Sequence, residues 1–166
     1  MQLGSFGFGF PELSLTDALF LDPGDFTLTG FGGPDVGAFQ EPLKIPAGIT
    51  WTNRDQISVI DRGRGFTATG SGAPAGTFAA VIGANVDLPT NSSALFLCLA
   101  PPGAGSFTVP PEILANIPPT RANMLQSKSV VYVGTLPAQP TAFTAGGLDA
   151  GALLSVFLTG KTVVFR

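Results

Sequence analysis

The chain has 166 residues, of which only 11% are charged and 45% are hydrophobic, and its net charge is −3. Roughly a quarter of the residues in an ordinary globular protein are charged, so we expect this chain to cover part of its uncharged exterior with copies of itself or with a partner. The absence of histidine excludes an imidazole base and histidine metal ligands. A pI near 4.6 speaks against nucleic-acid binding, which requires a basic face.

The first residues, MQLGSFGF, lack a basic region followed by an apolar stretch, so we do not expect a signal peptide here. In the segment SFGFGF, Phe6, Phe8 and Phe10 alternate with Gly7 and Gly9. An extended chain places the three rings on one face and leaves the opposite face bare. Two interpretations are open: this segment is a first strand paired within its own sheet, or it adds as a strand to a groove on a neighbouring copy.

Charge is sorted along the chain. Residues 1–43 hold six acidic and no basic side chains, whereas residues 44–166 hold five acidic and eight basic ones. This asymmetry predicts that an acidic N-terminal region meets a more basic surface, on its own body or on the next copy. We expect an extended N-terminal arm over residues 1–30 and a β-sandwich domain over residues 31–166.

Glycine and proline recur at short intervals, and the segments between them are rich in Val, Ile, Phe and Thr, which is typical of strands joined by turns. Several short strands without helical periodicity favour a sandwich or a barrel. The predicted strands are 25–31, 57–60, 66–69, 77–85, 94–100, 106–109, 129–136, 153–159 and 162–166.

One short helix is predicted over Pro111–Ile117, because proline suits a first helical position and Glu112 meets the positive end of the helix dipole. The cluster Asp61–Arg64 predicts a hairpin loop between strands 57–60 and 66–69. Gly160 and Lys161 predict a turn between the last two strands.

Two predicted strands are apolar without alternation, Leu95–Leu99 and Val130–Val133. A sandwich strand with one wet face alternates apolar and polar residues, so both faces of these strands should be covered. Either loops or the short helix of the same chain cover the outer face, or a neighbouring subunit does. Cys98, the only cysteine, is expected to be a buried thiol within the first run.

The remaining candidate sites each have an ordinary structural interpretation. Trp51 is either a core residue or a platform on which a sugar stacks. Asp17, Asp22, Asp25 and Asp35 carry oxygen ligands for calcium but lack the spacing of a calcium loop, so we interpret them as turn and capping acids. The cluster of Arg54, Arg62 and Arg64 is interrupted by acids, which indicates a solvated loop. The sequence contains no run of about 20 apolar residues, the length that would predict a membrane span.

A longer pattern includes WTN at Trp51–Asn53, FTVP at Phe107–Pro110 followed by Ile113, Leu114 and Pro118, and GLD at Gly147–Asp149. This pattern resembles a domain found near the ends of large secreted proteins of soil bacteria, from about Phe31 to the C-terminus. The resemblance implies an extracellular β-sandwich module without an assigned activity, and it carries no catalytic residues. Residues 1–30 lie outside it.

The sequence thus predicts an all-β fold, an immunoglobulin-like antiparallel β-sandwich with an N-terminal extended arm and one short helix. The predicted function is that of a non-enzymatic extracellular or cell-surface structural subunit, without cofactor or metal, that self-assembles into a filament or surface layer. Phe6, Phe8 and Phe10 form the predicted assembly arm. The alternative is a monomeric adhesion or carbohydrate-binding module of a larger secreted protein, with Trp51 as its ligand platform. Neither nucleic acid nor membrane insertion is expected.

Overall fold

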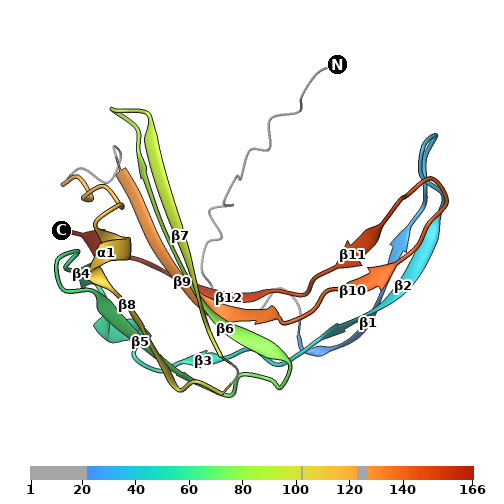
Figure 1. Cartoon of the computed structure of the whole chain (residues 1–166), viewed down its shortest axis with the longest axis horizontal. Helices are drawn as coiled ribbons and strands as arrows, with labels where there is room; N and C mark the ends of the chain where they lie inside the picture. The colour runs from blue at the N-terminus through green and yellow to red at the C-terminus, as the bar shows by residue number, and fades with distance from the viewer. Residues whose placement is uncertain (1–21, 102, 123–126) are drawn as a thin grey trace.

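The computed structural model describes residues 22–101, 103–122 and 127–166, and it is an all-β protein with several antiparallel sheets and one short helix (Figure 1). Strands account for 52% of these described residues and helices for 5%. The predicted class is therefore confirmed, while the immunoglobulin-like topology stays a prediction. Phe6, Phe8 and Phe10 lie outside the described residues.

A four-stranded antiparallel sheet forms one layer of the body, in the order β12-β9-β6-β7. The other layer contains the three-stranded sheet β3-β5-β8 and the parallel pair β13-β4. The first layer consists of β6 (Thr77–Asp87), β7 (Ser92–Ala100), β9 (Ser127–Pro137) and β12 (Phe157–Thr162). The second contains β3 (Thr50–Trp51), β4 (Val59–Ile60), β5 (Phe66–Ser71), β8 (Ser106–Val109) and β13 (Val164–Phe165), with the 3-10 helix η1 (Arg54–Gln56) and α1 (Pro111–Leu114) between strands.

The core lies between these two layers. In β7, Phe96 and Ala100 are buried and Cys98 is half-buried against the core, while the residues between them are exposed. The same alternation in β9 buries Val131 and Val133. The second layer contributes buried side chains from β3, β4, β8, α1 and β13: Trp51, Ile60, Val109, Leu114 and Phe165. The predicted thiol position of Cys98 is thus partly confirmed, and burial raises the pKa of that thiol.

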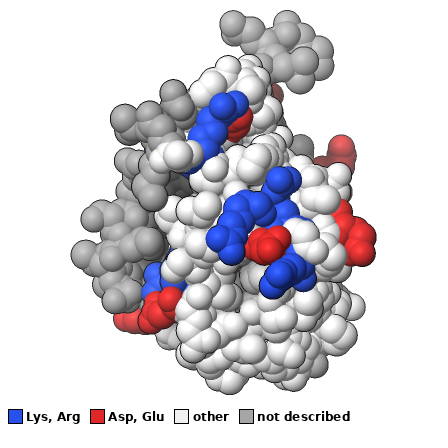
Figure 2. All heavy atoms as spheres, turned by 90° about the vertical axis from the view of Figure 1, so that its left-hand side faces the viewer, with Lys and Arg blue, Asp and Glu red and all other residues white. Residues whose placement is uncertain are grey.

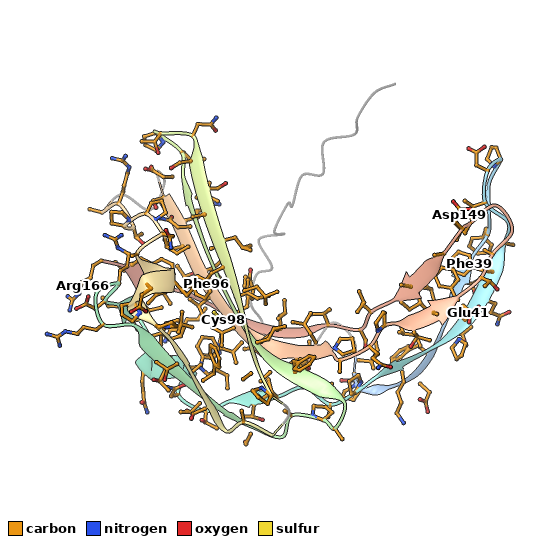
Figure 3. The ribbon with its side chains drawn as sticks, in the orientation of Figure 1. Phe39, Glu41, Phe96, Cys98, Asp149 and Arg166 are labelled. Carbon is orange, nitrogen blue, oxygen red and sulfur yellow. The ribbon has the colours of Figure 1, made fainter. Side chains whose placement is uncertain are left out.

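Two hairpins project from the body to the right in Figure 1, and we call them the double hairpin. One pairs β1 (Gly24–Gly30) with β2 (Phe39–Ile45), and the other pairs β10 (Thr141–Phe143) with β11 (Gly151–Leu153). Phe39 contacts Phe143 with ring centroids 4.7 Å apart, and the Gly37 amide donates to the Gly146 carbonyl at 2.6 Å. Figure 3 shows Phe39, Glu41 and Asp149 on this projection, far from Arg166 on the body.

No residue of the double hairpin is buried. An isolated two-stranded hairpin is only marginally stable in water, so the contacts between the two hairpins hold the projection together. The double hairpin carries four acidic side chains and one basic one, whereas residues 49–136 and 157–166 of the body carry four acidic and seven basic ones. Acidic side chains therefore predominate on the double hairpin and basic side chains on the body.

Aromatic rings repeatedly lie over glycines on the neighbouring strand. In each case the ring occupies the position that a Cβ on the glycine would need. Such pairing covers a glycine that would otherwise leave a gap in the sheet. The directly paired positions are Phe39 with Gly30, Phe96 with Gly83, Tyr132 with Gly160, and Phe143 with Gly151.

A polar cluster lies at the end of the sandwich where β6 finishes. Asn85 is completely buried, donates to the Pro118 carbonyl at 2.7 Å, and accepts from the hydroxyls of Ser127 and Ser129. Nearby, the Arg121 guanidinium binds the Asp87 carboxylate through Nε at 2.6 Å and Nη2 at 2.9 Å. These bonds tie the chain after α1 to β6 and β9.

Replacing Asp87 with asparagine is expected to lower the melting temperature at neutral pH. The hydrogen bond from Arg121 holds the pKa of the Asp87 carboxyl below its usual 3.8. A lowered pKa stabilises the fold above the usual value, and this stabilisation is lost as the pH falls through the lower folded value. The difference in melting temperature between the wild type and Asp87→Asn should therefore shrink below about pH 3.8.

Thermal unfolding followed by circular dichroism at pH 7 and at steps between pH 4 and pH 2 measures this difference. Asp55→Asn, at an exposed carboxylate of η1, is the control and should differ little from the wild type at neutral pH. A difference for Asp87→Asn that stays constant down to pH 2 would contradict the assignment.

Two predicted connections are wrong. Strands 57–60 and 66–69 do not form a hairpin, because β4 pairs in parallel with β13 while β5 pairs with β3 and β8. Gly160 and Lys161 are not a turn but lie inside β12. The helix is confirmed in place but ends at Leu114, before the predicted Ile117.

Candidate assembly surface

Strand β7 is an edge of the four-stranded sheet, and within the described part of the chain it pairs only with β6. It is nine residues long and contains neither a charged residue nor a proline. Natural sheets usually protect their edges with charges, prolines, bulges or covering segments, because an open edge can pair with another chain. β7 is protected neither by a charge nor by a proline.

The outer face of the same sheet is apolar. Leu95, Leu97 and Leu99 point away from the core and are 63%, 51% and 47% exposed. The strand register continues this apolar face onto Ala80, Ile82 and Ala84 of β6, Val130 and Tyr132 of β9, and Leu158 of β12. Ala80 and Ala84 are buried without belonging to the core cluster.

No described loop or helix covers the exposed leucines of β7. The short helix packs on the opposite side, where Leu114 is fully buried in the core. The predicted alternative in which the short helix covers the outer face is therefore wrong for β7. A large contiguous apolar patch on a soluble protein commonly marks an interaction site.

Trp51 is 6% exposed and belongs to the core cluster between the layers. Its indole Nε1 donates to the Asn53 side-chain oxygen at 2.9 Å, which satisfies its polar atom. A ring that stacks on a sugar needs an accessible face, and this one has none. The core interpretation of Trp51 is the one that its burial supports.

The basic cluster is on the end of the body that carries β4 and the C-terminus, the end that faces the viewer in Figure 2. Arg54 donates to the Gly160 carbonyl, Arg62 donates to the Ile117 carbonyl at 3.0 Å, and exposed Arg64 lies 3.5 Å from Asp61. The prediction of a solvated loop is therefore incomplete, because Arg54 and Arg62 also join separate segments of the body.

The described residues contain no group of acidic, cysteine or histidine side chains that could hold a metal ion. Asp17 lies outside the described range. An open depression of about 320 Å³ at the double hairpin is lined by Thr29, Gly30, Phe31, Ala38, Phe39 and Gln40, none of which is titratable. No helix in the described part of the chain is long and apolar enough to cross a bilayer.

Comparison with known proteins found no matching family model, no matching curated protein and no matching solved structure. The resemblance to domains of large secreted bacterial proteins stays a prediction.

Proposed function

We propose that this protein is a non-enzymatic extracellular structural subunit that self-assembles into a filament or surface layer. The N-terminal Phe-Gly segment with Phe6, Phe8 and Phe10 docks by strand addition on the next copy. The observation that carries the proposal is the uncovered apolar face beside an open strand edge, in a chain with few charges to keep that face solvated. Apolar burial of this kind is the main driving force of association.

Deleting residues 1–12 is the direct test. The deletion removes the three phenylalanines but leaves every described strand intact. We expect the shortened protein to remain folded and to stay near the mass of one chain, whereas the full chain forms large particles. Light scattering at micromolar concentration and electron microscopy measure the difference, and circular dichroism checks the fold.

A matched control separates the loss of rings from the loss of chain. The triple substitution of Phe6, Phe8 and Phe10 by serine keeps the length of the segment and should also abolish assembly. Particles of unchanged length after either alteration would overturn the docking role of this segment. A full chain that remains a single species near 17 kDa would favour the alternative, a monomeric adhesion or carbohydrate-binding module of a larger secreted protein.

A further inference from the structure

Building on the proposed function, we propose that the open edge of β7 is the acceptor for the SFGFGF segment of a neighbouring copy. The segment becomes a fifth strand of the sheet β12-β9-β6-β7. Its three phenylalanines lie on the outer face beside the three exposed leucines of β7.

The first support is a match of period and polarity. Leu95, Leu97 and Leu99 repeat every second residue on the outer face, as do the three rings of SFGFGF. Directly paired side chains on neighbouring strands stand about 5 Å apart, so each ring can cover one leucine. Both strands lack charge, and among the paired positions on this sheet face only Lys128 is charged.

The second support comes from the inner face, where the added strand would present Gly7 and Gly9 between its phenylalanines. Phe96 leans over Gly83 of β6 and therefore away from the open edge of β7. Glycine at the inner positions adds no side chain to the packed space between the two layers, so the added strand can pair with β7 without rearranging the core.

The available length of chain permits the exchange. Residues 11–21 link the SFGFGF segment to the described part of the chain and can span up to about 40 Å when extended. This is enough to leave one molecule at β1 and to reach the sheet edge of another.

The match of three rings to three leucines also indicates the register. Phe8, the middle ring, then pairs with Leu97, the middle leucine, for either strand direction, and a shift of two residues toward Ser93 places it opposite Leu95. A cysteine at position 8 of one copy should therefore approach a cysteine at position 95 or 97 of the next copy closely enough to form a disulfide.

The experiment uses full-length chains in which Cys98→Ala removes the natural thiol. Protein carrying Phe8→Cys is mixed with protein carrying Leu95→Cys or Leu97→Cys, oxidised, and analysed on a non-reducing gel. We expect a mixed disulfide dimer from at least one of these pairs, severalfold more abundant than from Phe8→Cys mixed with Thr108→Cys. Thr108 is an exposed residue on β8, the edge strand of the other layer, and serves as the control.

A second variant tests the surface without a disulfide. Leu97→Asp places a charge at the middle of the acceptor and should reduce assembly severalfold while the circular dichroism spectrum stays unchanged. Leu88→Asp is the matched control, because Leu88 is 58% exposed but lies beyond β6 in the turn. It should assemble as the wild type does.

The outcomes separate the two proposals. A wild type that assembles, but gives no mixed disulfide or is insensitive to Leu97→Asp, overturns the β7 acceptor and leaves self-assembly intact. A wild type that is monomeric overturns self-assembly and the acceptor together. A chain with both Phe8→Cys and Leu97→Cys that forms only an internal disulfide shows that the segment covers its own sheet, which also overturns docking on a neighbour.

Discussion

Replacing Phe165 with alanine is expected to destabilise the protein by about 3–5 kcal/mol, the usual cost of removing a buried phenylalanine. Phe165 is fully buried in β13 at the C-terminal end of the chain, against the core cluster. Its backbone is held separately, since its amide and carbonyl bond to Thr120, both at 2.8 Å. The substitution therefore leaves these bonds possible and creates a cavity between the layers.

Urea unfolding followed by circular dichroism measures this loss. It corresponds to a melting temperature roughly 6–20 °C lower, a large part of the stability of a typical domain. Phe31→Ala is the matched control, because Phe31 is 93% exposed on the double hairpin and should change the free energy of unfolding by less than about 0.5 kcal/mol. Equal effects at the two positions would mean that the core does not lie between the two layers.

Replacing Gly134 with alanine is expected to cost about 3 kcal/mol, the upper part of the usual range for over-packing. Gly134 lies in β9, and a Cβ there would overlap the carbonyl oxygen of Phe157 in β12. Backbone cannot rotate away as a side chain can. The edge strand β12 would have to move off β9, which would loosen the register between these two strands.

The measurements are the free energy of unfolding and hydrogen exchange of the amides in β12, which should become faster in Gly134→Ala. Gly33→Ala is the control, because a Cβ at Gly33 meets no atom within 4 Å. It should leave stability within about 0.5 kcal/mol of the wild type. Unchanged exchange in β12 would contradict the close approach of the two strands.

The long strands of the body were predictable because their composition decides their conformation. The runs rich in Val, Ala and Leu that became β6, β7 and β9 are bounded by glycine, proline or polar turns, and each lies where predicted. The proline at the start of α1 and the two prolines after Ile117 similarly made the position of α1 predictable.

Other elements were not predicted, because the local sequence does not encode them. β2 contains Pro42, which argues against a central strand. The proline is tolerated because, among the described residues, β2 pairs only with β1. The alternation of Phe39, Leu43 and Ile45 was the signal that could have revealed it. The pairing of β4 with β13 joins residues about 100 positions apart, and no local pattern reports such a contact.

The candidate surface was half predictable. The uninterrupted apolar run in β7 indicated that both of its faces need cover, and the structure assigns Phe96 to the core and the leucines to the outside. That β7 ends the sheet could not be read from the sequence, because strand order depends on distant pairings. The Phe-Gly segment drew attention by its period alone, and Trp51 showed that a single conspicuous residue is a weak guide to a site.

The separation of the acidic double hairpin from the more basic body gives the described part of the chain an electric dipole along its length. Two such dipoles attract each other when they are arranged head to tail, and they repel each other when they lie side by side and parallel. Screening in physiological salt limits this preference to close approach, within about 8 Å. Copies that approach each other closely therefore favour a head-to-tail arrangement with one shared orientation. A row of copies arranged in this way would have two different ends.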